Sequence, residues 1–79
     1  MNDRERIREI ISGILGSDRT SNMKDDDMLT GYPVKATAEE MVYIAMEVMD
    51  RYSIRFSPED LRQYAFNSVD GIISLLADR

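Results

Sequence analysis

The chain alternates between stretches that have apolar residues at helical spacing and stretches that have none. Residues 3–15 predict a first helix, because their apolar side chains recur every three or four positions and share one side. These side chains are Ile7, Ile10, Ile11, Ile14 and Leu15. Gly16 follows where a helix end favours a residue that tolerates positive φ. Gly13, inside the helix, costs about 1 kcal/mol relative to alanine, which predicts close packing or a frayed end there.

No sustained period of either kind is present from Ser17 to Ala36, so a long loop is predicted. Loops of more than about a dozen residues in a small domain are usually functional or mobile. We expect this one either to contain a turn of helix or to pack on the core through apolar side chains, namely Met28, Leu29, Tyr32 and Val34. Its acidic run, Asp25–Asp27, lacks the glycine and glutamate that a calcium-binding EF-hand loop needs, and it is interpreted as a solvated loop.

Two helix starts follow the loop. Thr37 with Glu40 three residues later is the pattern of a capping box, which predicts a second helix to about residue 51. Ser57 before Pro58 is typical of an N-cap and a first helical position, and it predicts a short third helix to about residue 62.

The linker and the last helix complete the pattern. In the linker 53–56, Ile54 and Phe56 alternate with polar residues and are expected to enter the core. Asn67 or Ser68 can cap a last helix, whose apolar side is formed by Val69, Ile72, Ile73 and Leu76. The sequence therefore predicts one all-α domain over residues 1–79, a small four-helix bundle with a short third helix and a long first loop.

The composition narrows the classes of function. With 43% hydrophobic and 32% charged residues, the chain resembles an ordinary soluble globular protein. Fifteen acidic against ten basic residues give a net charge of -5, which disfavours nucleic acid as a partner. A helix-turn-helix DNA binder is rejected because the second helix has one basic residue, Arg51, against four acidic ones, Glu39, Glu40, Glu47 and Asp50.

The chain has no cysteine and no histidine. It therefore offers no thiol nucleophile, no imidazole base and no ordinary zinc ligands, and we expect neither catalysis nor a metal site. No apolar run reaches membrane-spanning length, and the N-terminal stretch lacks the apolar core of a signal peptide. We expect a cytoplasmic protein that does not bind membranes.

The second helix has two apolar stripes. A core stripe is formed by Met41, Ala45, Val48 and Tyr52, with Ile44 at its edge. A second stripe is formed by Val42, Met46 and Met49, and it is bordered by Glu39, Tyr43, Glu47 and Asp50. A small bundle rarely buries both stripes, so these seven residues are predicted to bind a protein partner that presents a basic or apolar patch. The alternative is that the loop covers the second stripe through Leu29, Tyr32 or Val34.

The order of helices, long, long, short and long, resembles the family of acyl carrier proteins and peptidyl carrier proteins. The strongest local similarity is residues 48–60, VMDRYSIRFSPED, with the end of the first helix at Ile14-Leu15-Gly16 and the start of the last at Asn67-Ser68-Val69. The resemblance covers nearly the whole chain, and it implies a bundle of the acyl carrier protein type.

The family's attachment motif is altered in this chain. Where the family has Asp-Ser-Leu, whose serine takes the 4′-phosphopantetheine arm, this chain has Thr37-Ala38-Glu39. Ala38 has no hydroxyl, so the resemblance implies that no cofactor is attached there. Acids that the family tends to have are replaced by Tyr43 and Met49. Residues 29–34 and 41–43 also resemble acyl-carrier-related proteins of bacterial peptide maturation systems.

Two hypotheses follow from this resemblance. The first is a monomeric docking or scaffold protein for a modifying enzyme of a peptide-modification pathway, without a phosphopantetheine arm. The second is a working acyl or peptidyl carrier that is modified at an atypical hydroxyl, Thr37 or Thr30, and holds a thioester-bound group. Covalent modification distinguishes the two.

Overall fold

The computed structural model describes residues 2–62 and 64–77, and within these ranges the chain forms helices and connecting loops but no strand. The elements are α1 (Asp3–Leu15), α2 (Ser17–Thr20), α3 (Ala38–Tyr52), α4 (Pro58–Arg62), the 3₁₀ turn η1 (Tyr64–Asn67) and α5 (Val69–Ala77). The prediction of an all-α chain is confirmed. The four predicted helices are present, and α2 and η1 are added to them.

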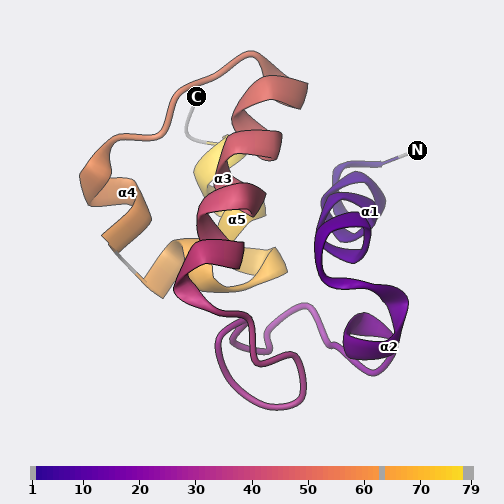
Figure 1. Ribbon diagram of the computed structural model, residues 1–79. Helices are drawn as coiled ribbons and strands as arrows, with labels where there is room; N and C mark the ends of the chain where they lie inside the picture. The colour runs from indigo at the N-terminus through magenta and orange to yellow at the C-terminus, as the bar shows by residue number, and fades with distance from the viewer. Residues whose placement is uncertain (1, 63, 78–79) are drawn as a thin grey trace.

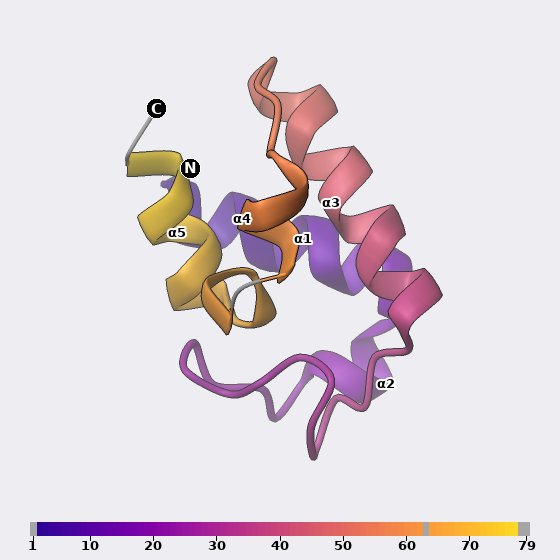
Figure 2. The ribbon, with the colours of Figure 1, turned by 90° about the vertical axis from the view of Figure 1, so that its left-hand side faces the viewer.

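Helix α1 packs against both α3 and α5. Figure 1 shows α1 on one side of these two helices and α4 on the other, and the turned view in Figure 2 shows the same order from front to back. Contacts between elements join α1 to both α3 and α5, whereas α4 is joined to η1. One side of α3 therefore faces α1 and α5, and its other side has no long helix opposite it.

Helix α1 has the predicted bounds, because both ends are capped. The side chain of Asn2 accepts a hydrogen bond from the Glu5 amide at 2.9 Å. Gly16 has φ of 92° and donates its N–H to the Ser12 carbonyl at 2.8 Å, which ends the helix. The close packing expected at Gly13 is wrong, since a Cβ placed there would meet nothing within 4 Å, and the helix continues past it to Leu15.

Helix α3 begins with the predicted capping box. The Thr37 hydroxyl accepts from the Glu40 amide at 3.1 Å, and the Glu40 carboxylate accepts from the Thr37 amide at 2.9 Å. The helix ends at Tyr52, one residue after the predicted end, because Ser53 adopts the left-handed conformation with φ of 53°. Its 15 residues give a length of about 22 Å.

The two C-terminal helices also begin at serines. Ser57 accepts from the Asp60 amide at 3.1 Å and starts α4. Ser68, and not Asn67, caps α5, because its hydroxyl accepts from the Gly71 amide at 2.9 Å. Asn67 instead bonds to the long loop.

The core lies where α1, α3 and α5 meet. Phe56 is buried as predicted, and its ring packs edge-on against Phe66 with 5.4 Å between ring centres. Ile54 is partly buried against the same core. In α5, Val69, Ile72 and Leu75 are buried, whereas the predicted Ile73 and Leu76 are only partly buried.

Both expectations for the loop 17–36 are met in part. It contains the single helical turn α2, and it packs on the core through Leu29 and Val34. Met28 and Tyr32, in contrast, are 46% and 81% exposed. The backbone supports this packing, because the Leu29 amide donates to the Asn67 carbonyl at 2.8 Å and the Ala36 amide donates to the Leu29 carbonyl at 2.7 Å.

Charged contacts fasten the loop to the helices. Asp25 accepts hydrogen bonds from Arg8 at 2.7 Å and from Arg4 at 2.9 Å, and Arg4 also pairs with Asp70 at the start of α5. The interpretation of the acidic run as solvated is therefore wrong for Asp25, which joins α1, the loop and α5.

Candidate functional site

The two faces of α3 differ in their exposure. On the inner face Ile44, Ala45 and Val48 are buried. On the outer face Val42, Tyr43 and Met46 are 55%, 51% and 57% exposed. The helix therefore uses one apolar face for folding and leaves the other to solvent.

Exposed apolar side chains are concentrated on this helix. Of the six exposed large hydrophobic residues in the described part of the chain, three are these outer residues of α3, and a fourth is Leu61 on the neighbouring α4. The loop does not cover them, because Leu29 and Val34 lie in the core and Tyr32 is exposed. The alternative interpretation, in which the loop buries the second stripe, is therefore wrong for Val42 and Met46.

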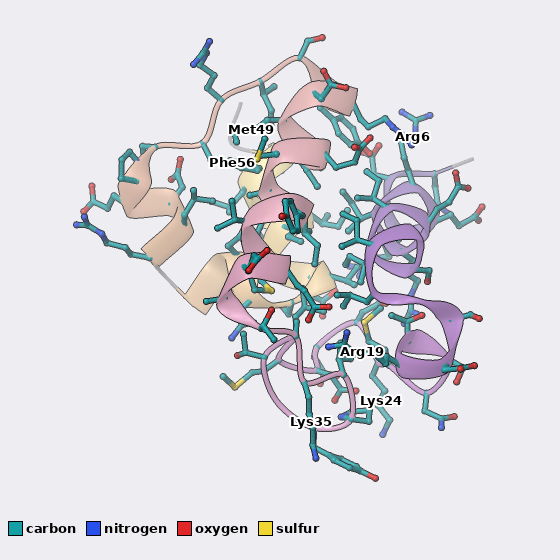
Figure 3. All side chains as sticks on the ribbon, viewed as in Figure 1. Arg6, Arg19, Lys24, Lys35, Met49 and Phe56 are labelled. Carbon is teal, nitrogen blue, oxygen red and sulfur yellow. The ribbon has the colours of Figure 1, made fainter. Side chains whose placement is uncertain are left out.

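Met49 lies apart from the other two residues of the second stripe. It is partly buried against the core, and its sulfur accepts a hydrogen bond from the Phe56 amide at 3.3 Å (Figure 3). The linker after α3 folds back toward this residue, which the periodicity of α3 alone does not indicate. Met49 thus lies where the exposed outer face of α3 meets the core.

The predicted acids border the apolar residues. Glu39 accepts a hydrogen bond from the Tyr43 hydroxyl at 3.0 Å, and Glu47 accepts one from Arg51 at 2.9 Å. Asp50 is exposed, and its side chain makes no hydrogen bond or ion pair within the described residues. The structure therefore brings all seven predicted partner-binding residues together on one helix, with Met49 the most enclosed of those in the apolar stripe.

The start of α3 carries the altered attachment position. Ala38 is the first residue of the helix, directly after the Thr37 cap, and it is exposed. Arg19 donates hydrogen bonds to both oxygens of Glu40, at 2.7 Å and 2.9 Å. The Arg19 hydrogen bonds, together with the Thr37 amide, lower the pKa of Glu40 to about 2. The helix start is thus fixed by α2 and by its own cap.

The two hydroxyls proposed as substitutes are both engaged. The Thr37 hydroxyl accepts the Glu40 amide hydrogen bond described above. The Thr30 hydroxyl accepts a hydrogen bond from the Asn67 side chain at 2.8 Å. Each hydroxyl therefore holds a neighbouring part of the fold in place.

Two hollows adjoin the outer face of α3. The first has a volume of about 370 Å³ and lies between the first half of α3, α4 and η1, with Val42, Leu61 and Phe66 in its lining. Ala38 is at its edge. The second has a volume of about 790 Å³ and lies over the second half of α3, with Met46 and Ile54 in its lining. The apolar periods of the helices indicate neither hollow, because the first depends on how α4 lies beside α3 and the second on how α1 and the linker after α3 lie beside it.

No group of three or more acidic side chains is placed to hold a metal ion in the described ranges. Within the same ranges, none of the helices has the length and apolar character needed to cross a membrane.

Comparisons with protein-family models, with curated proteins and with solved structures gave no match. The resemblance to carrier proteins therefore stays a prediction from the residues quoted above.

Proposed function

We propose that this chain is an acyl-carrier-like docking or scaffold protein that has no phosphopantetheine arm and binds a protein partner through the outer face of α3. The observation that supports this most strongly is the cluster of Val42, Tyr43 and Met46, which are exposed together on a helix whose opposite face is core. Contiguous exposed apolar side chains with a polar border are typical of protein interaction sites.

The chemistry of the face indicates the kind of partner. Methionine is flexible and polarizable, so Met46 can adapt to a partner's surface. Glu39, Glu47 and Asp50 at the border, and the net charge of -5, favour a partner with a basic or apolar patch. We infer that this partner is a modifying enzyme of a bacterial peptide-modification pathway, and that the protein acts in the cytoplasm as a monomer.

The proposed absence of an arm is supported by the chemistry of attachment. The phosphodiester of phosphopantetheine needs a hydroxyl oxygen, and alanine at position 38 has none. Thr37 is next to it, but its hydroxyl caps α3 and accepts from the Glu40 amide. Modification of Thr37 would therefore compete with the cap of the helix that carries the docking face.

The attachment site can be tested by intact mass. The wild-type protein and Ala38→Ser are incubated with coenzyme A and a broad-specificity phosphopantetheinyl transferase, with an ordinary carrier protein as positive control. We expect no mass gain for the wild type and a gain of one phosphopantetheine for Ala38→Ser. Because Ala38 is exposed at the start of α3, the new hydroxyl is accessible to the enzyme.

The other outcomes are equally informative. A gain on the wild-type protein contradicts the docking-only proposal and favours a working carrier, and Thr37→Val and Thr30→Val then locate the modified hydroxyl. Absence of a gain on Ala38→Ser, with the control protein fully converted, argues against a carrier-like helix start.

The docking face can be tested with two methionine variants. Met46→Glu places a charge in the outer face, whereas Met28→Glu places one at a similarly exposed methionine in the loop. A partner captured by chemical cross-linking in cells, and identified by mass spectrometry, should bind purified wild type and Met28→Glu alike. It should bind Met46→Glu at least ten-fold more weakly, because loss of a hot-spot residue near the centre of an interface costs about 2 kcal/mol or more. Equal binding by both variants contradicts the proposed face, and unfolding of Met46→Glu, checked by circular dichroism, would place Met46 in the core.

A further inference from the structure

The oxidisable sulfur of this chain is confined to methionine. The sequence has six methionines, no cysteine and no tryptophan. Three of the methionines, Met41, Met46 and Met49, lie on α3, the helix that carries the proposed docking face. A peroxide converts the methionine thioether into a sulfoxide, which is polar and disrupts interfaces that contain methionine. The exposure of each methionine therefore decides which part of the protein such an oxidant alters first.

The described methionines differ widely in exposure. Met46 and Met28 are 57% and 46% exposed, whereas Met23 is 4% exposed. Met41 and Met49 are partly buried against the core. Met46 also lines the hollow of about 790 Å³ over the second half of α3, from which a small oxidant can approach it. Met46 is therefore the most accessible methionine of the docking helix.

Met49 lines the same hollow, but its sulfur is engaged. The Phe56 amide donates a hydrogen bond to it at 3.3 Å, and Figure 3 shows these two labelled residues beside each other. A donated hydrogen bond withdraws electron density from the sulfur lone pairs, which are the electrons that attack a peroxide. Within the described residues the Met46 sulfur accepts no hydrogen bond. Exposure and hydrogen bonding thus both favour oxidation of Met46 over Met49.

A sulfoxide at position 46 would find no free hydrogen-bond donor on its own helix. The neighbours three and four positions away are Val42, Tyr43, Met49 and Asp50. Two of them are apolar, the Asp50 carboxylate accepts only, and the Tyr43 hydroxyl already donates to Glu39 at 3.0 Å. The sulfoxide oxygen would therefore keep water as its partner.

We propose that Met46 is an oxidation-sensitive site, at which a peroxide such as hydrogen peroxide weakens the docking face by forming a sulfoxide. The sulfur lone pair attacks one peroxide oxygen, the O–O bond breaks, an S–O bond forms, and water leaves. The sulfur loses two electrons and the peroxide gains them. A dithiol reverses the step with a sulfoxide reductase, because the oxygen leaves as water and the dithiol becomes a disulfide.

The loss of affinity follows from desolvation. A partner that covers the oxidised side chain removes the sulfoxide oxygen from water without a new hydrogen bond from α3, which corresponds to a loss of about ten-fold. Met28 lies in the loop, so its oxidation should leave binding unchanged. This effect on binding rests on the proposed function, whereas the order of oxidation does not.

The order of oxidation is measured on the protein alone. The folded protein is treated briefly with hydrogen peroxide, the reaction is stopped with catalase, and the oxygen gained at each methionine is measured by peptide mass spectrometry. Met46 and Met28 should be oxidised first, Met49 later and Met23 last. Oxidation of Met49 as early as Met46 overturns the assignment of the site.

The effect on docking is measured with matched leucine variants. Leucine keeps an apolar side chain and has no sulfur. The untreated partner, identified by cross-linking as above, should bind peroxide-treated wild type and Met28→Leu about ten-fold more weakly than before treatment. It should bind treated Met46→Leu unchanged. Incubation of treated wild type with methionine sulfoxide reductases and dithiothreitol should restore binding.

The contrary outcomes are distinct. An equal loss for treated Met46→Leu places the sensitive residue elsewhere, and unchanged binding by wild type that carries the Met46 sulfoxide shows that the face tolerates it; each overturns the proposal. Arg55 also lines this hollow, so a larger loss in Arg55→Gln than in wild type would contradict the absence of a donor. If the partner binds untreated wild type and Met46→Glu alike, the docking function fails, and the order of oxidation is still decided by the peptide measurement.

Discussion

The inner and outer faces of α3 have similar apolar side chains but opposite roles. On the inner face, Ile44 and Val48 are buried in the core, to which α1 and α5 also contribute buried side chains. On the outer face, Val42 and Met46 are more than half exposed, and they adjoin two hollows. The difference shows that an apolar stripe does not by itself determine whether a helix face is buried. The packing of the other elements of the fold determines which stripe is buried within this chain and which is left exposed.

The largest expected effect is a difference between the two faces of α3 in how far a substitution lowers the free energy of unfolding. Ile44→Ala should lower the free energy of unfolding by about 2–5 kcal/mol, because it removes a fully buried side chain. Met46→Ala should change it by no more than about 0.5 kcal/mol, as for most surface substitutions. Urea unfolding followed by far-ultraviolet circular dichroism measures both values. Equal losses of unfolding free energy would contradict this comparison and mean that the outer face is packed against other residues.

The second effect concerns the helix start that both faces share. Thr37→Ala removes the hydroxyl that accepts the Glu40 amide, and it should lower the free energy of unfolding by about 1 kcal/mol. Thr37→Ser keeps the acceptor and serves as the control in the same urea experiment. If Thr37→Ala has no effect, the capping box does not stabilise α3.

A pair of glycines extends the comparison to α1. Gly13→Ala should stabilise the protein by about 0.5–1 kcal/mol, because the added methyl group meets open space within a helix. Gly16→Ala should destabilise it by about 1 kcal/mol, because its φ of 92° strains a residue with a side chain. Melting temperatures of the two variants should move in opposite directions. A lower melting temperature for Gly13→Ala would indicate a contact on the exposed side of α1.

The smallest effect is the pH dependence of the α2–α3 contact. The pKa of Glu40 is lowered from 4.5 to about 2, so the folded state favours its ionised form. This contribution to stability is fully present above about pH 4.5 and is lost as the pH falls toward 2. Glu40→Gln should be less stable than the wild type at pH 7, and the difference should shrink between pH 4.5 and 2. The two proteins compared by urea unfolding across this range provide the test, and a constant difference would contradict the Arg19 contact as its cause.

The sequence predicted the elements that depend on neighbouring residues. The capping patterns at Thr37 and Ser57 and the terminating Gly16 act over a few positions, and they gave helix bounds within about one residue. The buried position of Phe56 and the second stripe of α3 followed from periodicity in the same way.

What the sequence did not predict depends on residues far apart along the chain. Arg4 meets Asp25 and Asp70, which are 21 and 66 positions away, and no local pattern indicates such a pairing. The sulfur of Met49 is enclosed because the linker after α3 folds back, so that the Phe56 amide donates a hydrogen bond to it. The first hollow depends on where α4 lies beside α3, and the second on where α1 and the linker after α3 lie. The seven proposed partner-binding residues stay a prediction, since their place on α3 alone does not name a partner.

The anchored loop has a consequence for how this protein would resist proteolysis. A protease needs an extended segment of several residues that can leave the surface, and the segment around Leu29 cannot leave without exposing a buried side chain and breaking its bonds to Asn67 and Ala36. Exchange of the Leu29 and Ala36 amides with deuterated solvent would then report opening of the core and not local fraying. We therefore expect the irregular segment around Leu29 to open only together with the core.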